Sequence, residues 1–174
     1  MKTLLSMKLV LVVFAAAATP ACTGTLNALT IDSKSAAEFG SPLEGAVSCA
    51  AMLELAAVAN APGLAGVANA STSQQYEAAL GAAFDQADAQ GLDVEPGSPL
   101  DDLDIALAYR HNARDELNRT LGLSSRDTAQ DATVASMVAS IKASYAENGI
   151  TGDNVLTLLS KTVERCRSDA DSLS

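Results

Sequence analysis

The sequence predicts an all-α protein, a compact bundle of four to five helices. Three observations predict this class: apolar residues recur at helical spacing, runs of β-branched or aromatic residues are few, and alanine is abundant. Recognisable start and stop residues divide the chain into helical segments joined by mostly short connections. With 174 residues, the chain has the length of one domain.

Two helix starts carry the same pattern. The tetrapeptides SPLE (41–44) and SPLD (98–101) each provide a serine cap, a proline at the first helical position and an acid at the third. The serine oxygen accepts a hydrogen bond from a free backbone N–H, and proline has no N–H that needs a partner there. The residues that follow the two starts differ, so the pattern is one capping solution used twice and not an internal repeat.

Helical spacing and punctuation predict five helices in order, at 42–60, 73–90, 99–121, 126–148 and 152–168. Proline and glycine end the first helix, and a glycine follows the next three. Segment 61–72 and the connector around 91–98 are expected to be irregular. The predicted buried faces are Val47, Leu53 and Ala57; Tyr76, Leu80 and Ala87; Leu103, Ala113 and Leu121; Val134, Val138 and Tyr145; and Val155, Leu158, Leu159, Val163 and Cys166.

The first 21 residues have the layout of a secretory signal peptide. Lys2 and Lys8 form a basic start, ten apolar residues follow, and Thr19-Pro20-Ala21 is a small-residue end. Lys8 interrupts the only stretch that approaches the ~20 apolar residues of a membrane-spanning helix. We therefore expect residues 1–21 to be a secretory or lipoprotein-type signal, 22–40 to be a tether, and 41–174 to form the bundle domain.

Cys22 stands directly after this small-residue end. In this respect the N-terminus resembles a bacterial lipoprotein signal, whose cysteine carries the lipid, although Thr19 and Pro20 depart from the usual pattern. The alternative is cleavage by the ordinary signal peptidase, which leaves Cys22 as a plain thiol. Three cysteines in an exported protein leave one unpaired, and a lipid on Cys22 would account for it.

Cys49 and Cys166 are expected to form a disulfide between the first and last helices of the bundle. Both lie near an apolar helix face, and export would place them in an oxidising compartment. The alternative is a pair of buried thiols that act only as small apolar side chains.

The charge of the chain excludes one class of function. Without the two lysines of the signal, nine basic residues stand against 21 acidic ones, a net charge of −12. Binding a polyphosphate requires the opposite sign, so we expect no nucleic-acid partner.

The acids are also unevenly distributed along the chain. Residues 35–109 contain eleven acids and no base, whereas 110–174 contain nine acids and eight bases. These acids predict an electronegative surface on the first two helices and the connector, which can steer a basic partner. The connector concentrates five candidate partner-binding acids: Asp93, Glu95, Asp101, Asp102 and Asp104. The alternative is that these acids only keep an alanine-rich protein soluble and pack beside the arginine-bearing helices.

His111 is the only histidine and shares a predicted helix face with Asp104 and Asp115. Two carboxylates and an imidazole can hold a metal or a small ligand. However, Arg110, Arg114 and other charged residues alternate along the same helix, which is typical of a solvated, salt-bridged face. No motif for zinc, haem, iron–sulfur, di-iron or phosphate binding is present, so we expect no metal, no cofactor and no catalysis.

Together these features predict an exported bacterial envelope protein, periplasmic or anchored to the outer membrane through Cys22. Its expected role is a non-catalytic, acidic helical module that binds a protein with a basic patch. The alternative is a bundle that binds a metal or small ligand with Asp104, His111 and Asp115. A third possibility is a structural envelope lipoprotein with no dedicated partner.

Overall fold

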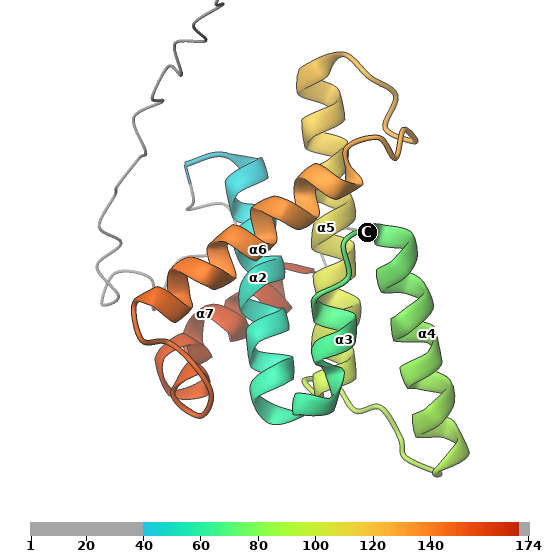
Figure 1. The fold of residues 1–174 in the computed structure, drawn as a ribbon, viewed down its shortest axis with the longest axis vertical. Coiled ribbons are helices and arrows are strands. Elements are labelled where there is room, and N and C mark those ends of the chain that lie inside the picture. The colour runs from blue at the N-terminus through green and yellow to red at the C-terminus, as the bar shows by residue number, and fades with distance from the viewer. Residues whose placement is uncertain (1–39, 171–174) are drawn as a thin grey trace, which may run out of the picture.

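The computed structural model describes residues 40–170, and all regular structure in that range is helical (Figure 1). The elements are α2 (Pro42–Asn60), the 3₁₀ turn η2 (Pro62–Leu64), α3 (Ala65–Ala68), α4 (Ser73–Ala89), α5 (Pro99–Leu121), α6 (Asp131–Glu147) and α7 (Asn154–Ala170). The all-α bundle predicted from the sequence is confirmed, with one short helix more than expected. The predicted signal, Cys22 and nearly all of the tether lie outside the described residues.

Helix α2 forms the centre of the bundle. It packs against α5, α6 and α7, and most of its length is buried, including Met52 and Leu53. By length and composition α2 is apolar enough to cross a membrane, yet 67% of its most apolar 18-residue stretch is buried inside the protein. A helix that is apolar all round is expected where other helices enclose it. The central position of α2 therefore accounts for its composition.

The predicted caps are present. The Oγ of Ser41 accepts a hydrogen bond from Glu44 N at 3.1 Å, and the Oγ of Ser98 accepts one from Asp101 N at 3.4 Å. At the other end of α5, Gly122 adopts a φ of +69°, a left-handed conformation that glycine accepts without strain. These local signals explain why the bounds of α2 and α5 match the sequence-based expectation.

Two segments differ from the prediction. The stretch 61–72 is not irregular throughout but contains η2 and α3, which bury Val67 and Ala68. The fourth predicted helix begins at Asp131 instead of 126, because side chains compete for the backbone before it. The side-chain amide of Asn118 donates to Asp127 O at 2.7 Å, and the carboxylate of Asp127 accepts from Ala129 N at 2.9 Å.

The core has two parts. The larger surrounds α2 and includes Met52, Leu53, Tyr109, Val138 and Leu159. The smaller lies between the end of α2, α3, α4 and α5, where Ala57, Val67, Tyr76, Leu80 and Leu103 meet.

Two leucines of the predicted buried faces are exposed instead, which corrects the sequence-based assignment. Leu121 is 54% exposed because it ends α5, whose C-terminal end extends beyond the neighbouring helices (Figure 1). Leu158 of α7 is 42% exposed, next to the buried Leu159 that packs on α2.

Helix α4 stands at the edge of the bundle (Figure 1). It packs mainly against α5 and α3, and only Ser73, Tyr76, Leu80 and Ala87 are buried. The remaining face of α4 is largely exposed, and so is most of the connector from 90 to 98.

Candidate functional site

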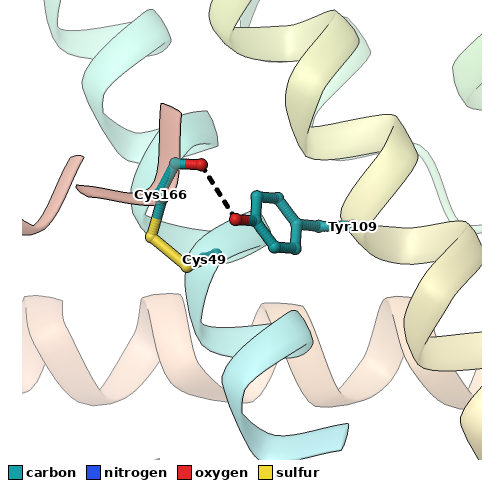
Figure 2. The surroundings of a disulfide bond; sticks show 3 residues. All are labelled: Cys49, Tyr109 and Cys166. Atoms are coloured by element: carbon teal, nitrogen blue, oxygen red, sulfur yellow. Dashed lines mark hydrogen bonds between the residues drawn. A yellow bond between two sulfur atoms is a disulfide. The ribbon is translucent and has the colours of Figure 1, made fainter. Parts of the chain in front are cut away.

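The predicted disulfide is confirmed. Cys49 of α2 and Cys166 of α7 are joined, with their Cα atoms 5.6 Å apart, and both residues are fully buried. The hydroxyl of Tyr109, on α5, donates a hydrogen bond to the backbone carbonyl of Cys166 at 2.8 Å (Figure 2). The bridge therefore fixes three helices around one buried point. Its burial identifies it as a structural link and not an accessible redox pair.

A buried ionic cluster lies on the other side of α2. Glu54 is fully buried, and its two carboxylate oxygens each accept a hydrogen bond of 2.7 Å, one from Arg110 Nε and one from Lys142 Nζ. The cluster joins α2, α5 and α6 and holds two positive charges against one negative charge. A buried carboxylate needs such partners, because removing a charge from water is costly.

The excess positive charge of this cluster is matched by the end of α3. Lys142 Nζ donates to Ala68 O at 2.6 Å, and Arg110 donates to Ala68 O and Ala70 O at 3.4 and 3.3 Å. The Arg110 guanidinium also lies 4.7 Å from the centre of the Tyr76 ring. Carbonyls at a helix C-terminus carry partial negative charge and favour cations. The cluster is thus a structural core element that the sequence pattern did not predict.

Asp102 is a correction to the predicted partner-binding set. It is fully buried, and its carboxylate accepts hydrogen bonds of 2.6 and 2.8 Å from Arg167 of α7. Burial raises the pKa of Asp102, whereas the bonds from Arg167 act against that rise. Arg167 also donates to Gly97 O at 3.3 Å. This pair attaches α7 to the start of α5 and is not available to a partner.

The other four predicted acids are divided between two environments. Asp101 is half-buried, and its carboxylate accepts a hydrogen bond of 2.6 Å from Gly97 N, which stabilises the turn before α5. Asp93, Glu95 and Asp104 are exposed. Of the predicted set, only these three remain fully accessible from solvent.

The exposed acids continue onto α4, which the sequence also predicted to contribute to an electronegative surface. Asp85 and Asp88 lie on its exposed side, close in sequence to Asp93 and Glu95 of the connector. We call these four residues the acidic face. Two apolar side chains lie among them, Leu92 at 59% and Val94 at 38% exposure. No basic residue occurs in the sequence between 73 and 97.

His111, Asp104 and Asp115 do not form a common site. His111 Nε2 lies 3.1 Å from Glu77 Oε1 of α4, without the alignment of a hydrogen bond. Asp115 instead accepts hydrogen bonds of 3.0 and 2.9 Å from Arg114. Within residues 40–170, no three His, Cys, Asp or Glu side chains are grouped to hold a metal ion. His111 and Asp115 line an open hollow of about 640 Å³ along α5, which Asp104 does not reach.

Comparison with family models, with curated proteins and with solved structures finds no match to this chain. The function of the chain is therefore inferred from its own residues.

Proposed function

We propose that the chain is an exported bacterial envelope protein that binds another protein through its acidic face. The partner would present a basic patch, and the interaction would involve no catalysis. The observation that carries this proposal is the combination, at the edge of the bundle, of four exposed acids with the exposed Leu92 and Val94.

Electrostatics supports this surface over the two buried acids of the same half. Glu54 and Asp102 are buried and paired with bases from the second half of the chain. The acids of α4 and the connector face solvent, where their field attracts a basic surface and accelerates association. Leu92 and Val94 add apolar area that a partner can bury, which charge alone would not provide.

Two features support export. The basic start, apolar run and small-residue end of segment 1–21 are typical of a secretory signal. A fully buried disulfide agrees with folding in an oxidising compartment. In addition, the disulfide consumes both described cysteines, which removes them as nucleophiles.

The lipid anchor at Cys22 is a separate part of the proposal. The intact mass of the mature protein from its host should show a diacylglyceryl and acyl addition on a chain that begins at Cys22. A mature chain of unmodified mass would contradict the anchor and leave a periplasmic protein.

A pair of charge-reversal variants tests the acidic face. In the first variant, Asp88, Asp93 and Glu95 become lysine; in the control, the exposed Glu147, Asp153 and Glu164 of the α6–α7 region become lysine. Both variants change the net charge by the same amount. We expect crosslinking and co-purification from native envelopes to recover a stoichiometric basic protein with wild type and with the control, but not with the first variant.

Equal recovery by the two variants would contradict the proposal, because binding would then follow overall charge or another surface. Loss of the complex in both variants would contradict it in the same way. Circular dichroism of each variant establishes that the bundle is intact.

A further inference from the structure

The connector that carries part of the acidic face is attached to the bundle at its two ends. At the first end, Leu92 N donates to Ala87 O at 3.0 Å and Gly91 N donates to Asp88 O at 2.9 Å, with Gly91 at a φ of +67°. This pair of hydrogen bonds around a left-handed glycine closes the C-terminus of α4. It fixes the point at which the connector leaves that helix.

Gly97 forms the second end and is held from two sides. Its N–H donates to Asp101 Oδ2 at 2.6 Å, and its carbonyl accepts a hydrogen bond of 3.3 Å from Arg167 Nη2. Gly97 has a φ of +78°, which glycine adopts without strain. A Cβ at this position would lie 3.6 Å from Arg167 Nη1, so the guanidinium lies directly against the glycine. The second end therefore depends on a residue of α7, 70 positions further along the chain.

Arg167 is itself fixed in place. Its Nε and Nη2 donate to the two carboxylate oxygens of the buried Asp102, at 2.6 and 2.8 Å. The residue before it, Cys166, is disulfide-bonded, and the Cys166 carbonyl accepts a hydrogen bond from Tyr109. A guanidinium that pairs with both oxygens of a carboxylate has a defined orientation. Arg167 therefore offers Gly97 a donor whose position is set by the core.

The segment between the two ends has few contacts of its own. Asp93 and Val94 form no hydrogen bond with other residues of 40–170, and residues 91–96 are all exposed. The conformation of this segment is therefore determined by its ends. A segment that is already ordered loses less conformational freedom when it binds, so holding the ends increases affinity.

We propose that Arg167 is a positioning residue for partner binding. Through the Gly97 carbonyl it holds the connector, with Leu92 and Val94, in the conformation that the partner binds. The inference rests on the proposed function and goes beyond it, because it gives a buried-core contact of α7 control over a surface at the edge of the bundle. Arg167 lies outside the acidic face and has the opposite charge, so electrostatic attraction of a basic partner does not require it.

Two variants remove the contact without changing the net charge. Arg167→Lys keeps a cation beside Asp102 but has no fork that reaches both Asp102 and the Gly97 carbonyl. The double variant Asp102→Asn/Arg167→Gln removes both charges, so that no buried carboxylate is left unpaired. Arg119→Lys is the matched control, because Arg119 is an exposed arginine of α5 that pairs with Glu116 away from the connector.

The first readout is backbone motion in the mature protein, measured by ¹⁵N relaxation. We expect order parameters at residues 93–95 near the about 0.85 of rigid backbone in wild type and in Arg119→Lys, and below about 0.6 in both Arg167 variants. Circular dichroism establishes that each bundle is intact, and the double variant decides the outcome if Arg167→Lys does not fold.

The second readout is the yield of adducts from a photo-crosslinking amino acid at Leu92 in the native host. Both Arg167 variants should lower this yield about tenfold or more, as the loss of one hydrogen bond to a charged donor implies, whereas Arg119→Lys should not. Attraction by net charge alone would leave the yield unchanged in all three variants.

The proposal is overturned if the wild-type connector is as mobile as that of the variants, if Arg167→Lys and Arg119→Lys have equal order parameters, or if the adduct yield does not fall. Absence of any adduct from wild type, with a connector that is ordered and becomes mobile only in the Arg167 variants, would contradict the proposed function while confirming that Arg167 holds the connector.

Discussion

The region around α2 is enclosed and cross-linked by other helices, whereas α4 and its connector are largely exposed. Helix α2 is enclosed by α5, α6 and α7, linked to α7 by a buried disulfide and to α5 and α6 by a buried ionic cluster. Helix α4 buries only four residues, and its connector exposes Leu92 and Val94.

This contrast separates two uses of acidic residues within one half of the chain. Acids that point inward, Glu54 and Asp102, are neutralised by Arg110, Lys142 and Arg167 from the second half. Acids that point outward from α4 and the connector meet solvent. Some of the acids in the first half are therefore neutralised inside the fold, and others are exposed at the surface.

Loss of the disulfide should have the largest effect. Replacing Cys49 and Cys166 by serine opens a loop of 117 residues, which in the chain-entropy estimate costs about 4–5 kcal/mol. Denaturant unfolding of wild type with and without reductant should show the same loss. The serine variant itself should not respond to reductant, and an unchanged midpoint would show that α2 does not depend on this bridge.

Breaking the buried cluster should be nearly as harmful. Glu54→Gln keeps the shape but leaves Arg110 and Lys142 without their carboxylate, and we expect a loss of about 3–5 kcal/mol in the free energy of unfolding. The matched change on α4, Asp85→Asn, should stay within about 0.5 kcal/mol of wild type. Equal effects in urea unfolding would remove the distinction between inward and outward acids.

Truncation of leucines makes the same comparison with apolar residues. Leu53→Ala in α2 removes a fully buried side chain and should cost about 2–5 kcal/mol. Leu92→Ala in the connector should change stability by no more than about 0.5 kcal/mol. A loss for Leu92→Ala as large as that for Leu53→Ala would mean that the connector is packed in solution.

Alkaline titration tests how firmly α4 is attached. The chain has three tyrosines, all buried, and burial raises the pKa of each, that of Tyr145 to about 12. The pKa of each folded-state tyrosine thus exceeds the value of about 10 in the unfolded chain. The buried, protonated tyrosines therefore contribute fully to the free energy of unfolding below pH 10. This contribution is lost as pH rises, for Tyr145 between about 10 and 12.

Tyrosinate absorbance should therefore appear together with loss of helical circular dichroism, in one transition above pH 10. If Tyr76 of α4 ionises near pH 10 while the helical signal is intact, α4 detaches locally and the smaller core does not hold it in place.

Sequence alone predicted the parts of this fold that depend on local signals. The caps at Ser41 and Ser98 and the stop at Gly122 gave correct bounds for α2 and α5, because each signal acts within a few residues. The disulfide was predictable from the placement of Cys49 and Cys166 on apolar faces.

The ionic pairs were not predictable in this way. Glu54 and Lys142 are 88 residues apart, and Asp102 and Arg167 are 65 apart, so only the packing of helices brings them together. For the same reason Asp102 was wrongly assigned to the surface. An acid in the otherwise apolar run around Glu54 was the one available signal that a buried partner was needed.

We propose that a partner docks on the acidic face, and the proposed function depends on this contact. It is tested most directly by placing a photo-crosslinking amino acid at Leu92, and at Leu158 of α7 as an exposed control outside the acidic face, in the native host. We expect a specific adduct with a basic protein from position 92, weakened by salt, and none from position 158. Adducts from position 158 alone, or equally from both positions, would contradict it.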